Sequence, residues 1–207
     1  MNEALPVGLR PKRSPCPKLR ISIVTYAPDN AILRKTVTSL ERSVAGLTDF
    51  LVDLTLIDNG PSGSEASLRS LFLDVRLSTK VLSGQGNVGY GQGHNLAISG
   101  DSDYHLILNP DVELAENALV NALAFMREHL ACGLLSPSVL DGSGGRQYLC
   151  KRYPTILDLA LRGFSPAWLK RQFAERLARY EMRDQIGDKV VWNPPIVSGC
   201  FMLFKTE

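Results

Sequence analysis

Residues 21–44 read ISIVTYAPDNAILRKTVTSLERSV, and this stretch predicts a buried strand followed by an amphipathic helix. Ile21–Thr25 is a short run rich in β-branched residues, which is typical of a buried strand. The tripeptide Pro28-Asp29-Asn30 supplies a turn and a helix cap. The apolar residues that follow are spaced four, three and four apart, at Leu33, Val37, Leu40 and Val44. Such a strand and helix form the first part of a parallel β-α-β unit.

The same alternation continues along the chain. Further strands are expected at 52–57, 79–82 and 104–108, and helical segments at 64–72, 96–98 and about 119–126. Beyond residue 130 the alternation weakens, with helices expected near 155–162 and 166–183 and a last strand at 197–204. The sequence therefore predicts an α/β fold, a Rossmann-like and mostly parallel sheet flanked by helices, over residues 20–207. Residues 1–19, which are rich in proline and basic side chains, are expected to form a flexible leader.

Composition excludes several classes of protein. The chain has 207 residues, is 44% hydrophobic and carries a formal net charge of only +2, which argues against a nucleic-acid binder. No apolar run reaches the roughly 18 residues of a membrane-spanning helix, and the first residues do not resemble a secretory signal. The four cysteines lack CxxC spacing and are expected to be reduced and structural. A cytoplasmic location fits these features.

Polar residues cluster where the predicted strands end. They are Thr25-Tyr26, Asp58-Asn59, the glycine-rich segment 87–95 and Asn109-Pro110-Asp111. Because ligands bind open α/β sheets outside the carboxyl ends of the strands, we expect these loops to line one site. Their order suits a nucleotide whose base, ribose and diphosphate occupy successive loops.

Asp111 is the candidate metal ligand. A diphosphate leaving group develops negative charge that Mg²⁺ or Mn²⁺ would neutralise, and a carboxylate is a suitable ligand for either ion. The alternative is that Asp111 caps the turn into the next helix. Asn109 would either accept a hydrogen bond from a metal-bound water or close a turn.

Residues 84–89 also match the dinucleotide fingerprint GxGxxG, which would indicate a nicotinamide-dependent oxidoreductase. The fingerprint belongs after the first strand, whereas this match follows the third, and Asp101 and Asp103 come sooner after Gly89 than the acidic residue that the fingerprint places about 20 residues further on. The glycines at 89, 91 and 93 are better explained by close approach of the backbone to a phosphate or sugar, with His94 and Asn95 at a helix start. A solvent-exposed flexible loop is the other alternative.

Five motifs together resemble a known family. They are ISIVTY at 21–26, LIDNG at 56–60, NVGYGQGHN at 87–95, LILNPD at 106–111 and VSGCFML at 197–203. The set resembles the inverting family 2 glycosyltransferases, which have the GT-A fold. Within that family the chain is most similar to bacterial rhamnosyltransferases of O-antigen and cell-wall polysaccharide assembly.

The resemblance implies roles for individual residues. Asp111 would hold the metal, and Asn109 replaces the aspartate that is commoner at that position. Ser198 and Gly199 would lie beneath the donor sugar. The complete set implied to bind the nucleotide sugar is Thr25, Tyr26, Asp58, Asn59, Asn87, Gly89, Gly93, Asn95, Asn109, Ser198 and Gly199.

The resemblance also implies a catalytic base in an acidic motif further along the chain. No such motif occurs before Glu207, so we expect the base beyond that residue and a chain truncated at its carboxyl end. The leading hypothesis is transfer of a hexosyl group, such as L-rhamnose, from a dTDP-, UDP- or GDP-sugar to a polysaccharide or polyprenyl-linked acceptor. The alternative is a nucleotide-sugar-binding domain with weak or no activity.

Membrane contact is a further hypothesis. The helix expected at 166–183 places an apolar stripe beside several arginines and lysines, which would suit a peripheral contact with the inner face of the membrane. A helix packed on the domain with a solvated basic face explains the pattern as well.

Overall fold

The computed structural model describes residues 16–61, 63–72, 77–98, 100–187 and 189–206. Most of the expected leader lies outside these residues, and the first strand already begins at Lys18. The strands of the first half are β1 (Lys18–Thr25), β2 (Leu51–Asp58), β3 (Ser78–Leu82) and β4 (Tyr104–Leu108). The helices between and after them are α1 (Asn30–Ala45), α2 (Ser64–Leu71), α3 (Tyr90–Asn95) and α4 (Ala118–Glu128).

The second half consists of short elements and one longer strand. Its strands are β5 (Leu134–Leu135), β6 (Val139–Leu140), β7 (Arg146–Gln147), β8 (Cys150–Lys151), β9 (Ile196–Val197) and β10 (Phe201–Lys205). Its helices are α5 (Ile156–Phe164), α6 (Ala167–Gln172) and α7 (Ala174–Tyr180). The helix expected at 166–183 is therefore two helices with a break at Phe173, and the strand expected at 197–204 is interrupted at 198–200.

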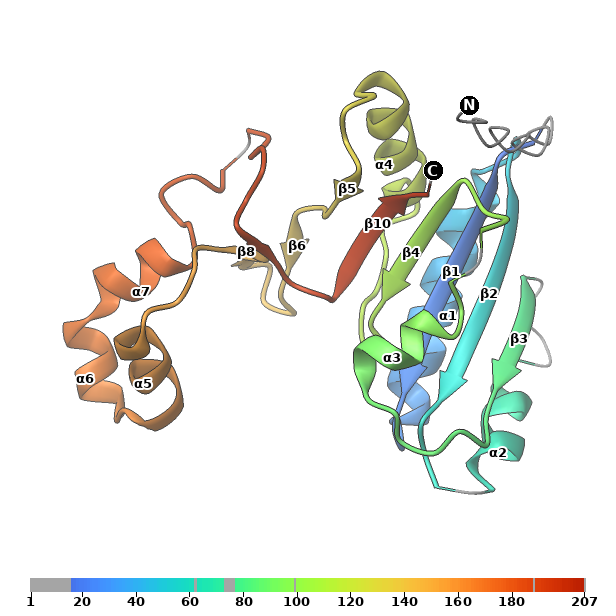
Figure 1. The fold of residues 1–207 in the computed structure, drawn as a ribbon, viewed down its shortest axis with the longest axis horizontal. Helices are drawn as coiled ribbons and strands as arrows, with labels where there is room; N and C mark the ends of the chain where they lie inside the picture. The colour runs from blue at the N-terminus through green and yellow to red at the C-terminus, as the bar shows by residue number, and fades with distance from the viewer. Residues whose placement is uncertain (1–15, 62, 73–76, 99, 188, 207) are drawn as a thin grey trace, which may run out of the picture.

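The central sheet has six strands in the order β3-β2-β1-β4-β10-β5 (Figure 1). Strands β1 to β4 pair in parallel, whereas β10 runs antiparallel between β4 and β5. This sheet confirms the predicted α/β class with a mostly parallel sheet. The chain runs from β1 to β2 and β3 on one side and then crosses back to β4 on the other side of β1, and this reversal of strand order creates a crevice at the carboxyl ends of β1 and β4.

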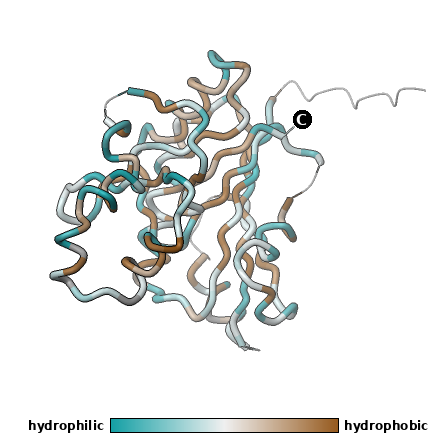
Figure 2. The backbone as a smooth tube through the Cα atoms, turned by 60° about the vertical axis from the view of Figure 1, so that its left-hand side comes forward, coloured by the Kyte–Doolittle hydropathy of each residue, from teal (hydrophilic) through white to brown (hydrophobic). Residues whose placement is uncertain are grey.

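The sheet buries different residues on its two faces because side chains alternate along each strand. Ile21 and Ile23 pack with Leu33, Leu40 and other apolar residues of α1 and α4 in the main core. Val24 packs on the opposite face with Ile57 and Ala97, next to α3. Figure 2 shows the hydrophobic residues concentrated along the central strands. The predicted stripe of α1 is thus buried as its spacing indicated.

Three hydroxyl groups on α1 hold the segment that carries Asp111. Thr36 donates to the Pro110 carbonyl at 2.8 Å, Ser39 accepts from the Leu114 N–H at 3.0 Å, and Ser43 accepts from the Leu119 N–H at 3.1 Å. All three residues are buried. Buried backbone groups need such partners, so α1 fixes the course of the chain from Pro110 to the start of α4.

Helices α5, α6 and α7 form a group that stands apart from the sheet in Figure 1. Thr155 and Asp158 form a capping box at the start of α5, and Arg176 of α7 reaches the Asp158 carboxylate at 2.7 Å. Tyr180 is buried, whereas Ile156 and Trp168 are exposed. In the part of the chain that the structure describes, no helix combines the length and apolar character needed to cross a membrane.

Candidate functional site

The polar loops named from the sequence meet at one edge of the sheet. Thr25 pairs with Asp58 across β1 and β2, and the Asn109 N–H donates to the Cys200 carbonyl at 2.9 Å. The amino end of β10 therefore lies beside the carboxyl end of β4, because β10 is antiparallel. The sheet topology thus places the loops after β1, β2 and β4 and before β10 along one crevice.

A cavity of about 550 Å³ occupies the β2 side of this edge. Its lining includes Tyr26, Asp58, Asn59 and Asn87, which are four of the residues predicted to bind the nucleotide. Thr25 is buried beneath them, and its hydroxyl donates to the Ile57 carbonyl at 3.3 Å. The cavity lies within the size range of small-molecule sites and is lined mainly by polar residues.

Asp58 also shapes the loop that closes the cavity. Its carboxylate accepts the Gly60 N–H at 2.8 Å and the Ser64 hydroxyl at 2.6 Å, and only 2% of the residue is exposed. A side chain at position 60 would come within 2.8 Å of the Asp58 carboxylate, so glycine is needed there. The carboxylate is therefore held in one orientation at the strand end.

Asn59 connects β1, β2 and the glycine-rich loop. Its N–H donates to the Thr25 carbonyl at 2.8 Å, and its side-chain amide donates to the Gly89 carbonyl at 3.1 Å. Gln85 donates to the Asp58 carbonyl at 2.8 Å, a contact that the sequence did not predict. The sequence held one sign of this contact, because Gln85 stands between Gly84 and Gly86. In the structure both glycines have positive φ.

The glycine-rich loop leads into α3, which lies on β1. Gly89 has φ 83°, and its N–H donates to Asn87 Oδ1 at 3.1 Å. A Cβ at Gly93 would lie 2.8 Å from Val24, so this glycine permits close packing of α3 on β1. Asn95 is exposed and ends α3, whereas the sequence placed it at a helix start. The loop follows β3, an edge strand, which supports the rejection of the dinucleotide fingerprint.

Tyr90 links the two loops on the other side of the crevice. Its hydroxyl lies 3.0 Å from Asn109 Oδ1 and 2.5 Å from the Gly199 carbonyl oxygen. Burial, together with the charges of Cys200 and Asp111, raises the pKa of Tyr90 to about 12. Burial also raises the pKa of the Cys200 thiol, with a smaller contribution from Asp111. Asp111 is thus close to both residues, although its own side chain is exposed.

Asp111 does not cap the helix that follows. Helix α4 begins only at Ala118, and Asn117 is its N-cap residue, so Asp111 lies in a turn ahead of the helix and is not its N-cap. Ser198 is half-buried, and its N–H donates to the Leu149 carbonyl at 2.8 Å. Ser198 and Gly199 therefore lie in the interruption between β9 and β10, at the same edge as Asp111.

The described residues fit a metal ion that is bound jointly by the protein and a diphosphate ligand. Across the described ranges, no group of three or more His, Cys, Asp or Glu side chains gathers as a metal site. Mg²⁺ is usually held by one or two carboxylates together with substrate phosphates, and Asp111 offers one exposed carboxylate next to the crevice. The site thus suits an ion completed by a diphosphate and not one held by the protein alone.

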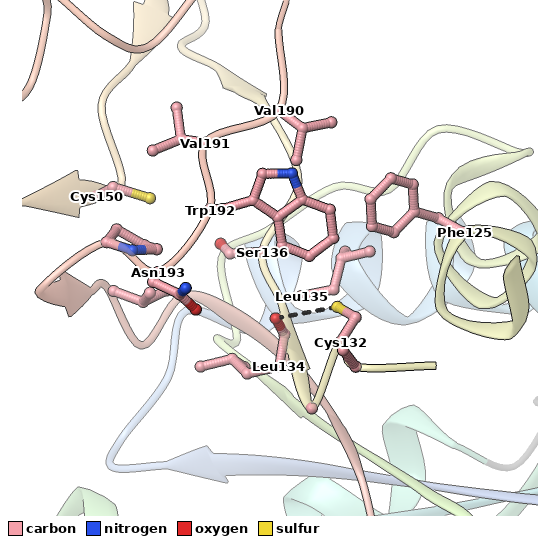
Figure 3. Close-up of a pocket in the computed structure, with 14 residues that line it drawn as sticks. Phe125, Cys132, Leu134, Leu135, Ser136, Cys150, Val190, Val191, Trp192 and Asn193 are labelled. Carbon is pink, nitrogen blue, oxygen red and sulfur yellow. Dashed lines mark hydrogen bonds between the residues drawn. The ribbon is translucent and has the colours of Figure 1, made fainter. Parts of the chain in front are cut away.

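A second cavity lies away from this edge. A pocket of about 280 Å³ lies between α4 and the 190–194 segment, and Trp192, Phe125 and Cys132 are part of its lining (Figure 3). The Cys132 thiol contacts the Leu134 carbonyl at 3.5 Å. None of the residues predicted to bind a nucleotide sugar lines this pocket. The candidate site is therefore the crevice at the strand ends.

Solved structures with a similar fold are glycosyltransferases. The chain is similar to the mannosyltransferase PcManGT from Pyrobaculum calidifontis in complex with GDP-Man and Mn²⁺, with a TM-score of 0.56 and 16% identity. It is also similar to residues 1–349 of TarS from S. aureus in complex with UDP, with a TM-score of 0.50 and 20% identity. These alignments cover 97% and 65% of this chain but only 48% and 40% of the other two.

The likeness establishes the fold. The chain has a GT-A fold, and it spans less than half the length of either similar structure. No protein-family model and no curated protein matches the sequence.

Proposed function

We propose that this chain forms the donor-binding part of a glycosyltransferase. The observation that carries the proposal is the meeting of four polar strand-end loops along one crevice, with a cavity at one side and Asp111 at the other. The similar structures support it, because one contains GDP-Man with Mn²⁺ and the other contains UDP.

The proposal assigns parts of the donor to parts of the crevice. The base and ribose would occupy the cavity lined by Tyr26, Asp58, Asn59 and Asn87. Gly89, Gly93 and Asn95 belong to the segment along which the nucleotide sugar would extend. The donor sugar would lie over Ser198 and Gly199.

The diphosphate would lie beside Asn109 and Asp111. A divalent ion bound there would neutralise the negative charge that the diphosphate gains as the sugar bond breaks. Asp111 would supply the carboxylate ligand for Mg²⁺ or Mn²⁺. The chain itself would orient the donor, with Asp58 held by Ser64 and the 109–111 segment held by Thr36.

The finer parts of the proposal concern chemistry and acceptor. We propose inverting transfer of a hexosyl group, with L-rhamnose as one candidate, to a polysaccharide or lipid-linked saccharide. We place donor binding on the described residues and assign none of them as the catalytic base. A peripheral membrane contact through the 166–183 segment, which contains α6 and α7 and exposes Trp168, belongs to the same proposal, and co-sedimentation with anionic liposomes tests it.

Binding is tested by the melting temperature of the 207-residue chain with UDP, GDP or dTDP, each with and without Mn²⁺. At about 100 times its Kd, the correct nucleotide should stabilise the fold by about 2.7 kcal/mol and raise the melting temperature by about 5–10 °C. NAD serves as the control for the fingerprint at 84–89. Stabilisation by NAD and by none of the three diphosphates would contradict the proposal. A donor-hydrolysis assay then separates an enzyme from a binding domain.

A further inference from the structure

Tyr90 is held in a fixed place by contacts on two sides. Its ring lies edge-on to the His94 ring, with centroids 4.5 Å apart, and His94 Nδ1 lies 2.7 Å from the Ser22 hydroxyl in β1. On the other side, a Cβ at Gly199 would lie 3.3 Å from both Cε1 and the hydroxyl oxygen of Tyr90. Glycine at 199 therefore leaves space for the tyrosine ring.

The Tyr90 hydroxyl faces two oxygen atoms but has only one proton to donate. The Gly199 carbonyl oxygen, at 2.5 Å, can only accept, so it takes that proton. The group of Asn109 at 3.0 Å must then donate to the tyrosine oxygen, which its amide NH₂ can do. Oxygen and nitrogen of a side-chain amide are assigned from their hydrogen-bond partners, and here those partners favour nitrogen toward Tyr90.

We propose that Tyr90 is a positioning residue that holds the Asn109 amide with its nitrogen toward the tyrosine and its oxygen free to face a divalent cation beside Asp111. This inference rests on the proposed function. It explains how an asparagine can bind the cation at position 109, where an aspartate could bind it with either carboxylate oxygen. A neutral amide has one oxygen that can bind a cation, and its NH₂ group would repel the same cation. The chain from Asn109 through Tyr90 to Gly199 selects the productive orientation.

The test compares the affinity for a nucleoside diphosphate with and without saturating Mn²⁺, measured by calorimetry on the 207-residue chain. UDP, GDP and dTDP are tried first on the wild type, and the tightest is used. Tyr90→Phe removes the hydroxyl and keeps the ring. It should leave the metal-free affinity unchanged and reduce the Mn²⁺-dependent gain about tenfold, which is the usual effect of losing a partner that orients a metal ligand. Tyr153→Phe is the matched control, because Tyr153 is 75% exposed and lies outside the crevice.

A second background separates orientation from a general structural effect. In Asn109→Asp, either oxygen of the carboxylate can face the cation, so adding Tyr90→Phe should change the Mn²⁺-dependent gain little. An equal loss in both backgrounds, or no loss from Tyr90→Phe alone, would overturn the role of Tyr90 while leaving the proposed function intact. If the wild type binds no nucleoside diphosphate, the proposed function fails and this inference fails with it.

Discussion

Asp111→Asn is expected to abolish the Mn²⁺-dependent part of nucleotide binding. The substitution keeps the size of the side chain and removes the negative charge that would hold the cation at the end of β4. Because Asp111 is the carboxylate proposed to bridge metal and protein, the cation should then bind only to the nucleotide. In melting experiments at about 100 times the wild-type Kd, most of a rise of about 5–10 °C should disappear.

A matched control separates charge from position. Glu116→Gln removes an exposed carboxylate from the same connection between β4 and α4 and should keep the full Mn²⁺-dependent rise. Because Asp111 is exposed, neither variant should melt much below the wild type without ligand. An equal rise with Mn²⁺ in Asp111→Asn and wild type would refute the role of Asp111.

Acid is expected to destabilise the fold through two buried histidines. His94 and His105 lie on either side of the Ser22 hydroxyl, at 2.7 and 2.8 Å, and are 1% and 2% exposed. Burial is the main cause that lowers the pKa of each histidine to about 4. The neighbouring His105 lowers the pKa of His94 further. Arg20 lowers the pKa of His105, and Asp53 opposes this effect. The second ring nitrogen of each histidine has no hydrogen-bond partner, so an added proton there would be unsatisfied.

The direction of the effect follows from the lowered pKa values. As the pH falls below 6.5 the unfolded chain takes up protons that the folded chain does not, so stability is lost between about pH 6.5 and 4. At pH 5 the loss should be about 2 kcal/mol for each histidine relative to pH 7. Urea unfolding at the two pH values measures it.

The double variant His94→Asn, His105→Gln provides the comparison, because each amide can replace the ring nitrogen that contacts Ser22. It should lose far less stability than the wild type between pH 7 and 5. NMR of the folded wild type gives a check without substitution: neither His94 nor His105 should titrate above pH 5. Normal titration of His94 or His105 would contradict the buried neutral pair.

The regular part of the fold could be predicted from local spacing. The strand at 21–25 and the stripe of Leu33, Val37 and Leu40 are set by alternation and by helical periodicity, and both are buried as expected. The convergence of Asp58 and Asn109 also followed, because the loops after parallel strands meet at one edge.

The features that were missed depend on contacts between distant residues. In helix α3, polar residues alternate with glycines at 91 and 93, and there is no apolar stripe, so local periodicity does not predict where the helix starts. The contact that the sequence does not reveal is the packing of Gly93 against Val24 of β1. His94 was expected near a helix start, but the register of β1 and β4 buries it with Ser22 and His105. The hydroxyls of α1 that hold the 110–119 segment likewise have no local signal, because their partners lie more than 70 residues away.

In the proposed function, Asp111 and the strand-end crevice hold a nucleoside diphosphate through a divalent cation. Crystals of this chain grown with the best-binding nucleotide and Mn²⁺ test it most directly, because manganese is located by its anomalous scattering. One strong anomalous peak is expected within bonding distance of an Asp111 carboxylate oxygen and of the diphosphate, with the base in the cavity beside Asp58. A nucleotide bound elsewhere, or manganese bound away from Asp111, would contradict it.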